Sequence, residues 1–291
     1  MKICTYFFQE VAVVYPGGNG RRKGQDRSPF VNVDTTTLEG IADAIEMGFA
    51  ESNLAKTVVT PFIYEANDLF SLNAKGRLFT VFRHPVERAV SFFYYIQVAQ
   101  WEPTYDPELK DWSIERYAMS DRVEDNWLTR RLSNDRHGEL TDQHLVIAME
   151  VIRRKMLVGL LSNIEATMER FERFFHWTYH VNPPNQEECR ARLLSAGGGS
   201  NTFEFHAKDS GNILNEKHEV KEGDAVWNLF ERHNQKDVQL YGYIQELFEQ
   251  QEDLVKDLPE NYRLDDATCC KCGPPSYPKD EEFTCPLSIL N

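Results

Sequence analysis

The period of the hydrophobic and polar positions changes sharply at one place in the chain. Residues 78–82 form a short apolar run rich in aromatic and β-branched side chains, preceded by Lys75 and Gly76, which predicts a buried strand. Pro85 cannot continue a sheet but suits the first turn of a helix. From Val86 onward, apolar residues recur at helical spacing. The pattern therefore predicts a strand, a tight turn and a helix in immediate succession.

Similar patterns elsewhere predict strands that alternate with helices. Apolar runs predict strands at 11–15, 30–33, 57–60 and 156–161. Capping residues and helical spacing predict helices at 38–51, 142–154 and 186–195, a helix that a capping box at 162–165 opens and that runs through 175, and a closing amphipathic helix from 237. Because such alternation is typical of parallel sheets, the expected fold class is α/β, with a mainly parallel central sheet flanked by helices.

The composition is ordinary for a globular protein, but the charge is strongly acidic. The 291 residues are 41% hydrophobic and 27% charged, and the formal net charge is −14. This charge argues against general nucleic-acid binding and would repel any polyanionic partner that lacked a local basic patch. The sequence contains no run of about 18 apolar residues, so it predicts no membrane span. The apolar stretch at the start is too short for a secretory signal.

The predicted domain organisation has three parts. An uncertain segment at 1–29 holds the glycine-rich, basic stretch 16–24, which is predicted to be a flexible loop because it does not fit a P-loop pattern; a phosphate site is the alternative. The main domain spans 30–250, and a loosely ordered tail spans 251–291. The tail holds four of the six cysteines, at 269, 270, 272 and 285. Free thiols, a disulfide and a zinc site all remain open for them.

The predicted strand–turn–helix suits an anion. Arg83 falls at the carboxyl end of the strand, where ligands of open α/β sheets bind. The helix amino terminus is expected to add free N–H donors and partial positive charge. Ser91 supplies a hydroxyl two turns into the helix, and the Arg83 guanidinium is a planar fork for phosphate oxygens. The alternative, which is about equally favoured by the pattern alone, is a surface arginine and a helix serine with no ligand.

The segment from Arg83 to Tyr95 closely resembles the 3′-phosphate-binding segment of sulfotransferases, especially carbohydrate enzymes of the heparan sulfate 2-O-sulfotransferase type. The strand, the proline, two arginines, a serine and an aromatic tail occur in the family's order. Those enzymes transfer a sulfuryl group from 3′-phosphoadenosine 5′-phosphosulfate (PAPS). The resemblance extends weakly over 30–248, and it implies a P-loop NTPase-like sulfotransferase fold, PAPS as co-substrate and no metal.

The resemblance also implies which residues bind the nucleotide. Arg83 and Ser91 would hold the 3′-phosphate. Arg88 matches the family as well, although its first interpretation is a structural ion pair. Arg130, with its neighbour Arg131, lies in a segment that the family places near nucleotide and acceptor, and a solvated helix face is the competing explanation. Lys217 occupies the region of a basic loop that closes over PAPS in the family.

The catalytic base is less clearly indicated. In related sulfotransferases the stretch after the strand preceding the phosphate strand often carries a catalytic His or Glu, and Glu65 is the strongest candidate there. The alternative is a solvated loop carboxylate. His84 either lines the site or is polar packing, which the sequence favours.

The expected function is transfer of a sulfuryl group from PAPS to a hydroxyl of a carbohydrate or small-molecule acceptor, and the acidic charge favours a neutral one. The Lys-Xaa-Gly-Thr-like loop with which sulfotransferases bind the 5′-phosphosulfate is not found. Either the amino terminus is incomplete or transfer activity has been lost. The alternatives are therefore an inactive nucleotide-binding domain and a P-loop phosphotransferase relative.

The family implies the Golgi lumen if a membrane anchor precedes this chain, and the cytoplasm otherwise. The sequence leaves the oligomeric state open.

Overall fold

The computed structural model describes residues 14–15, 30–55, 57–100, 102–175 and 220–256. The chain divides into two compact units, with the boundary between Arg77 and Leu78. The boundary therefore falls inside the segment 30–250.

The described part of the first unit holds a short hairpin and two helices. Strands β1 (Val14–Tyr15) and β2 (Phe30–Val31) pair antiparallel, and helices α1 (Leu38–Glu46) and α2 (Ile63–Asn67) follow. A small core of buried residues joins the helices: Ile41, Ala44, Phe49, Ala66 and Leu69.

Two predictions for this unit are wrong. Helix α1 ends five residues before the predicted 51, because Gly48 takes a left-handed backbone conformation with φ of 59° just after the helix. Residues 57–60 do not form a strand, and Val59 is 76% exposed. The apolar pattern of this segment therefore does not correspond to burial.

The second unit is built on a parallel pair of strands. Strand β3 (Leu78–Phe82) pairs with β4 (Met156–Leu160) in a register that joins Leu78 to Met156 and Phe82 to Leu160. Helix α3 (Pro85–Ile96) follows β3 after two residues, and α6 (Asp142–Lys155) runs directly into β4. The strand, turn and helix predicted around Arg83 are thus confirmed, as is the α/β class.

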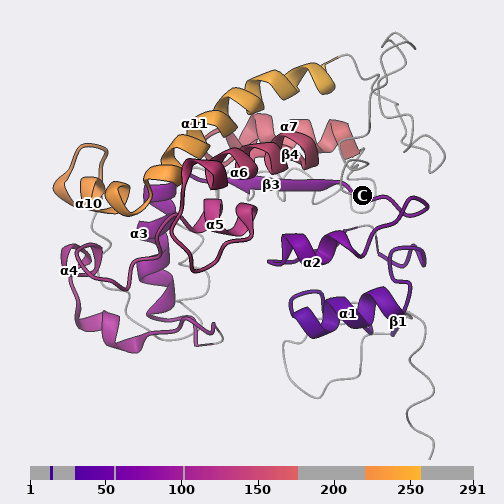
Figure 1. Cartoon of the computed structure of the whole chain (residues 1–291), viewed down its shortest axis with the longest axis horizontal. Coiled ribbons are helices and arrows are strands. Elements are labelled where there is room, and N and C mark those ends of the chain that lie inside the picture. Colours follow the sequence, from indigo (N-terminus) through magenta and orange to yellow (C-terminus); the bar gives the residue numbers. More distant parts are fainter. Residues whose placement is uncertain (1–13, 16–29, 56, 101, 176–219, 257–291) are drawn as a thin grey trace, which may run out of the picture. The chain divides into compact units, whose positions relative to one another are not determined.

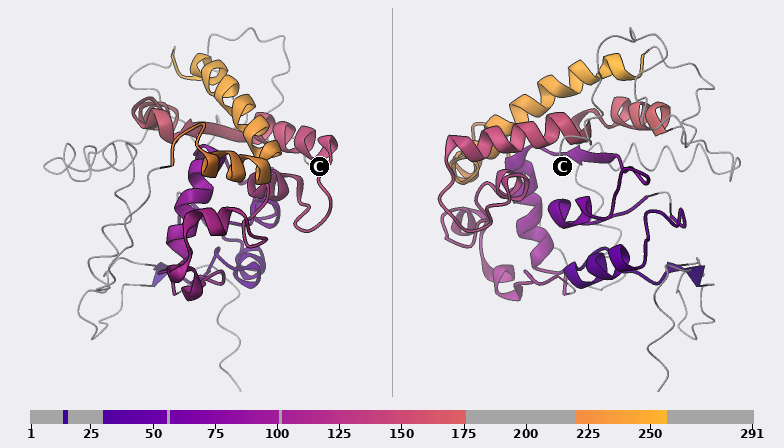
Figure 2. Two further views of the ribbon diagram at one scale, coloured as in Figure 1. Left: turned by 90° about the vertical axis from the view of Figure 1, so that its left-hand side faces the viewer. Right: turned by 45° about the vertical axis from the view of Figure 1, so that its right-hand side comes forward.

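Helices surround this pair of strands (Figure 1). Helices α7 (Ile164–Phe175) and α11 (Gln235–Gln250) contact β4, and α11 also lies against α6, as both views of Figure 2 show. Helices α4 (Ile114–Ala118) and α10 (Ala225–His233) pack on α3. Helix α5 (Trp127–Ser133) contacts α6 and α11, and short 3₁₀ turns span Pro107–Asp111, Leu161–Asn163 and Gln251–Leu254.

In the described residues, the edge of β4 that does not pair with β3 is hydrogen-bonded by side chains and not by a third strand. The Gln251 amide accepts a hydrogen bond from the Val158 N–H and donates one to the Met156 carbonyl, both at 2.8 Å. The Thr167 hydroxyl accepts from the Leu160 N–H and donates to the Leu160 carbonyl. Because these groups of β4 are already paired, the described sheet ends at this strand. In the described residues the expected parallel sheet therefore has two strands.

Candidate anion site at the turn between β3 and α3

Local bonding fixes the turn between β3 and α3. His84 is the N-cap of α3, and its Nδ1 accepts a hydrogen bond from the Val86 N–H at 3.3 Å. The His84 carbonyl accepts from the Arg88 N–H at 2.9 Å, and Pro85 has no N–H. Among the described residues, Glu87 alone in this first turn keeps an N–H without a partner. The free N–H donors expected at this helix terminus are therefore largely used by His84, and an anion could use only the Glu87 N–H and side chains.

Arg83 supplies the exposed positive charge at this turn. Its Nε donates to Oε2 of Glu87 at 3.3 Å, and the two side chains are 33% and 50% exposed. The two terminal nitrogens of Arg83 have no partner within the part of the chain that the structure describes. Glu87 and Ser91 are four residues apart on α3, so they lie on the same side of the helix. Arg83 thus bonds Glu87, and Ser91 lies one turn further along the same side of α3.

Arg88 points to a different set of partners. It forms an ion pair with Glu124, with 2.9 Å between Nη2 and Oε2, and its guanidinium lies 4.1 Å from the centroid of the Trp127 ring. The ion pair expected of Arg88 is confirmed. A ligand that used Arg88 would have to share it with Glu124.

His84 is packed between aromatic rings. Its ring stacks on Trp227 of α10 at a centroid distance of 4.8 Å and meets the edge of Tyr241 of α11 at 5.3 Å. Burial lowers the pKa of His84 below its ordinary value, against the opposing charges of Glu87, Glu222 and Glu231. Polar packing, the favoured sequence interpretation of His84, is confirmed.

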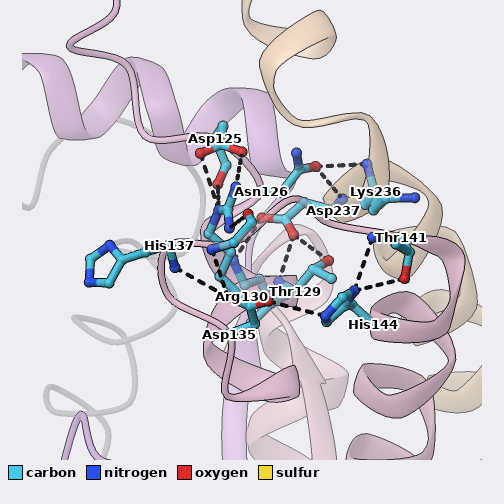
Figure 3. Close-up of polar contacts among 12 residues, drawn as sticks. Asp125, Asn126, Thr129, Arg130, Asp135, His137, Thr141, His144, Lys236 and Asp237 are labelled. Carbon is cyan, nitrogen blue, oxygen red and sulfur yellow. Dashed lines mark hydrogen bonds and ion pairs between the residues drawn. The ribbon is translucent and has the colours of Figure 1, made fainter.

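Arg130 uses all three of its guanidinium nitrogens within the protein (Figure 3). Nε and Nη2 bond Asp125, the latter at 2.6 Å, and Nη1 donates to the Gly138 carbonyl at 2.8 Å. Its side chain is only 16% exposed. Arg130 therefore ties together the segments before and after α5, which differs from the solvated helix face weighed for it. Arg131 lies beside Trp127, with 5.4 Å from its guanidinium carbon to the ring centroid.

A buried polar link joins α5 and α11 and was not predicted from the sequence (Figure 3). The Asp237 carboxylate accepts from the N–H groups of Leu128 and Thr129 and from the Thr129 hydroxyl, at 2.7–2.8 Å. In return, Oδ1 of Asn126 accepts from the N–H groups of Lys236 and Asp237. Each helix thus caps the amino terminus of the other. The sequence shows an Asn before one helix and an Asp in the first turn of another, which are typical capping residues. Neither residue indicates from the sequence which helix it caps.

Asp237 is the most deeply buried carboxyl group of this region. Its residue is 2% exposed, and burial raises its pKa, while the hydrogen bonds from Thr129 and Leu128 oppose that shift. Its bonds all serve the two helix termini. We therefore assign it a structural role.

The remaining predicted site residues lie elsewhere. Glu65 lies in α2 of the first unit and is partly buried. Lys217, the glycine-rich segment 16–24, the predicted helix 186–195 and all six cysteines lie outside the described residues.

The first unit offers a second strand–turn–helix, formed by β2, residues 32–37 and α1. The turn carries no lysine; Asp34 lies in it and accepts hydrogen bonds from the N–H and hydroxyl of Thr36 at 3.0 and 2.6 Å. These bonds lower the pKa of Asp34, so that its carboxyl group is ionised at neutral pH. A fixed negative charge at this turn disfavours an anionic ligand there.

The described residues contain neither a membrane-spanning helix nor a cluster of metal ligands. No described helix combines the length and the apolar character needed to cross a membrane. No group of three or more His, Cys, Asp or Glu side chains is arranged there to hold a metal ion.

No family model matches the chain, and neither a curated protein nor a solved structure matches it.

Proposed function

We propose that this chain is a PAPS-dependent sulfotransferase, in which the turn between β3 and α3 binds the 3′-phosphate of the nucleotide. The observation that carries the proposal is the Arg83 guanidinium at the carboxyl end of a parallel strand, with Ser91 on the same side of the following helix. A planar, permanently charged fork and a nearby hydroxyl match the oxygens of a phosphomonoester. The proposal includes a P-loop-like sulfotransferase fold.

The proposed reaction is in-line transfer of a sulfuryl group to a hydroxyl of the acceptor. Such a reaction requires cations that hold the phosphosulfate and a base that takes the proton of the attacking hydroxyl. Glu65 is the proposed base and Lys217 a further nucleotide ligand, both suggested by the family resemblance. Arg88 and Arg130, which the resemblance also suggests, are bonded to Glu124 and to Asp125 and Gly138, so a nucleotide would have to share them with these partners. The net charge of −14 favours a neutral carbohydrate or another small hydroxylated acceptor.

The test is calorimetric binding of adenosine 3′,5′-bisphosphate and of adenosine 5′-phosphate to the full chain. The protein should bind the bisphosphate more tightly, because only this nucleotide carries the 3′-phosphate. Arg83→Ala should weaken its binding by about 1.5–3 kcal/mol, the range for a hydrogen bond to a charged group. The exposed Arg232 of α10 provides the matched control, and Arg232→Ala should leave both affinities unchanged. Equal affinity of the wild-type protein for the two nucleotides would refute the proposal.

A second candidate is a nucleotide-binding domain without transfer activity. It is favoured because the Lys-Xaa-Gly-Thr-like loop with which sulfotransferases bind the 5′-phosphosulfate is not found in the sequence. An acceptor screen with radiolabelled PAPS separates the two functions. Labelled product identifies an enzyme, whereas tight bisphosphate binding without product from any acceptor supports the binding domain.

A further inference from the structure

Arg83 is the side chain on which anion binding at this turn depends, because His84 already uses most of the helix N–H groups. Its position is set by one described contact, the bond from Nε to Oε2 of Glu87 at 3.3 Å. We propose that Glu87 is a positioning residue: it holds the Nε side of the guanidinium and directs the two terminal nitrogens to the 3′-phosphate. This inference rests on the proposed nucleotide-binding function.

The shape of the guanidinium group explains why the bond from Arg83 Nε to Glu87 matters for phosphate binding. A guanidinium binds a phosphate through two parallel N–H bonds, either from its two terminal nitrogens or from Nε and one terminal nitrogen. Because Glu87 takes the Nε side, the terminal pair remains for the ligand. The Arg83 side chain is 33% exposed, so without Glu87 it would sample several rotamers. Glu87 restricts it to the side of α3 that also carries Ser91.

Glu87 acts on a bound phosphate in two opposite ways. Its acceptor oxygen orients Arg83, which favours binding, while its negative charge repels the phosphate. A glutamine at this position keeps an acceptor oxygen and removes the charge. An alanine removes both. The two substitutions therefore separate positioning from repulsion, and the orienting contribution has the size of an exposed ion pair.

The experiment measures, by calorimetry, the ratio of the affinities for adenosine 3′,5′-bisphosphate and adenosine 5′-phosphate. The ratio of Glu87→Ala should lie about two- to five-fold below that of Glu87→Gln, the range that an exposed ion pair contributes, because the two variants share the loss of charge and differ in the acceptor oxygen. In Glu87→Gln it should stay at or above the wild-type value. Glu169→Ala, which removes an exposed glutamate from α7, is the matched control and should leave the ratio unchanged.

Other outcomes overturn the inference. If Glu87→Ala and Glu87→Gln both raise the ratio by the same factor, Glu87 acts by charge alone. If Glu87→Ala and Glu87→Gln have the same ratio, the Arg83 fork does not need the acceptor oxygen of Glu87. A wild-type ratio of one refutes the proposed function itself, so the failure of the function and the failure of this inference are distinguishable.

Discussion

The role of a charged residue in this chain depends on the partners that the fold gives it. The sequence assigns Arg83, Arg88 and Arg130 the same possible role as nucleotide ligands. Arg130 uses every guanidinium nitrogen to join Asp125 to Gly138, and Arg88 is held by Glu124, whereas Arg83 uses only Nε among the described residues. These differences set Arg83 apart as the ligand candidate. The sequence indicated an ion pair for Arg88 but could not identify its partner, because Glu124 lies 36 positions from Arg88.

At the same scale, His84 should make the stability of the protein depend on pH. Its Nδ1 accepts the Val86 N–H, which requires a neutral ring, and burial lowers its pKa below the unfolded value of 6.5. The unfolded chain therefore binds the proton more readily. The free energy of unfolding should fall as the pH drops from about 6.5 toward the lower pKa of the folded state.

Urea unfolding between about pH 7.5 and about pH 5.5 measures this effect. His84→Asn keeps a side-chain acceptor at the N-cap but cannot titrate, so the loss of stability on acidification should be smaller than in wild type. His137 is exposed, and His137→Asn should retain the full wild-type pH dependence. An identical pH dependence in His84→Asn would show that protonation of His84 is not linked to folding.

At the scale of the element, the sequence predicted best those elements whose signals are local. The boundaries of β3 were predicted without error, and those of α6 and β4 to within one residue, because apolar period, proline and capping residues lie within the element itself. The segment 57–60 failed because a strand also needs a neighbour to bond, which no local pattern supplies. The same limit applies to the edge of β4, whose partner Gln251 lies 93 positions from Val158.

The bonds of Gln251 to β4 give a prediction about that element. Gln251→Met keeps the length of the side chain but leaves the Val158 N–H and the Met156 carbonyl buried without these partners. The free energy of unfolding should fall by at least about 2 kcal/mol, since each unsatisfied buried group costs about 1–3 kcal/mol. Gln250→Met, at the exposed neighbouring position, is the control and should change stability little. Equal urea midpoints for the two variants would contradict the role of Gln251.

At the scale of the whole molecule, the division into two units at residue 77 predicts two unfolding transitions. The distribution of tryptophan makes them separable. All five tryptophans lie at or after position 101, within the second unit, so tryptophan fluorescence reports on that unit alone. Circular dichroism reports on the helices of both units.

One glycine in each unit tests this division, because neither position has room for a Cβ atom. At Gly40 the added atom would overlap the Asp34 carbonyl oxygen, and at Gly159 it would overlap the Thr167 side chain where α7 crosses β4. Gly159→Ala should lower the stability of the second unit by about 1–3 kcal/mol and shift the fluorescence midpoint. Gly40→Ala should shift part of the circular dichroism transition and leave the fluorescence midpoint in place. If Gly40→Ala moves both signals together, the two units unfold as one, and the boundary at residue 77 has no thermodynamic meaning.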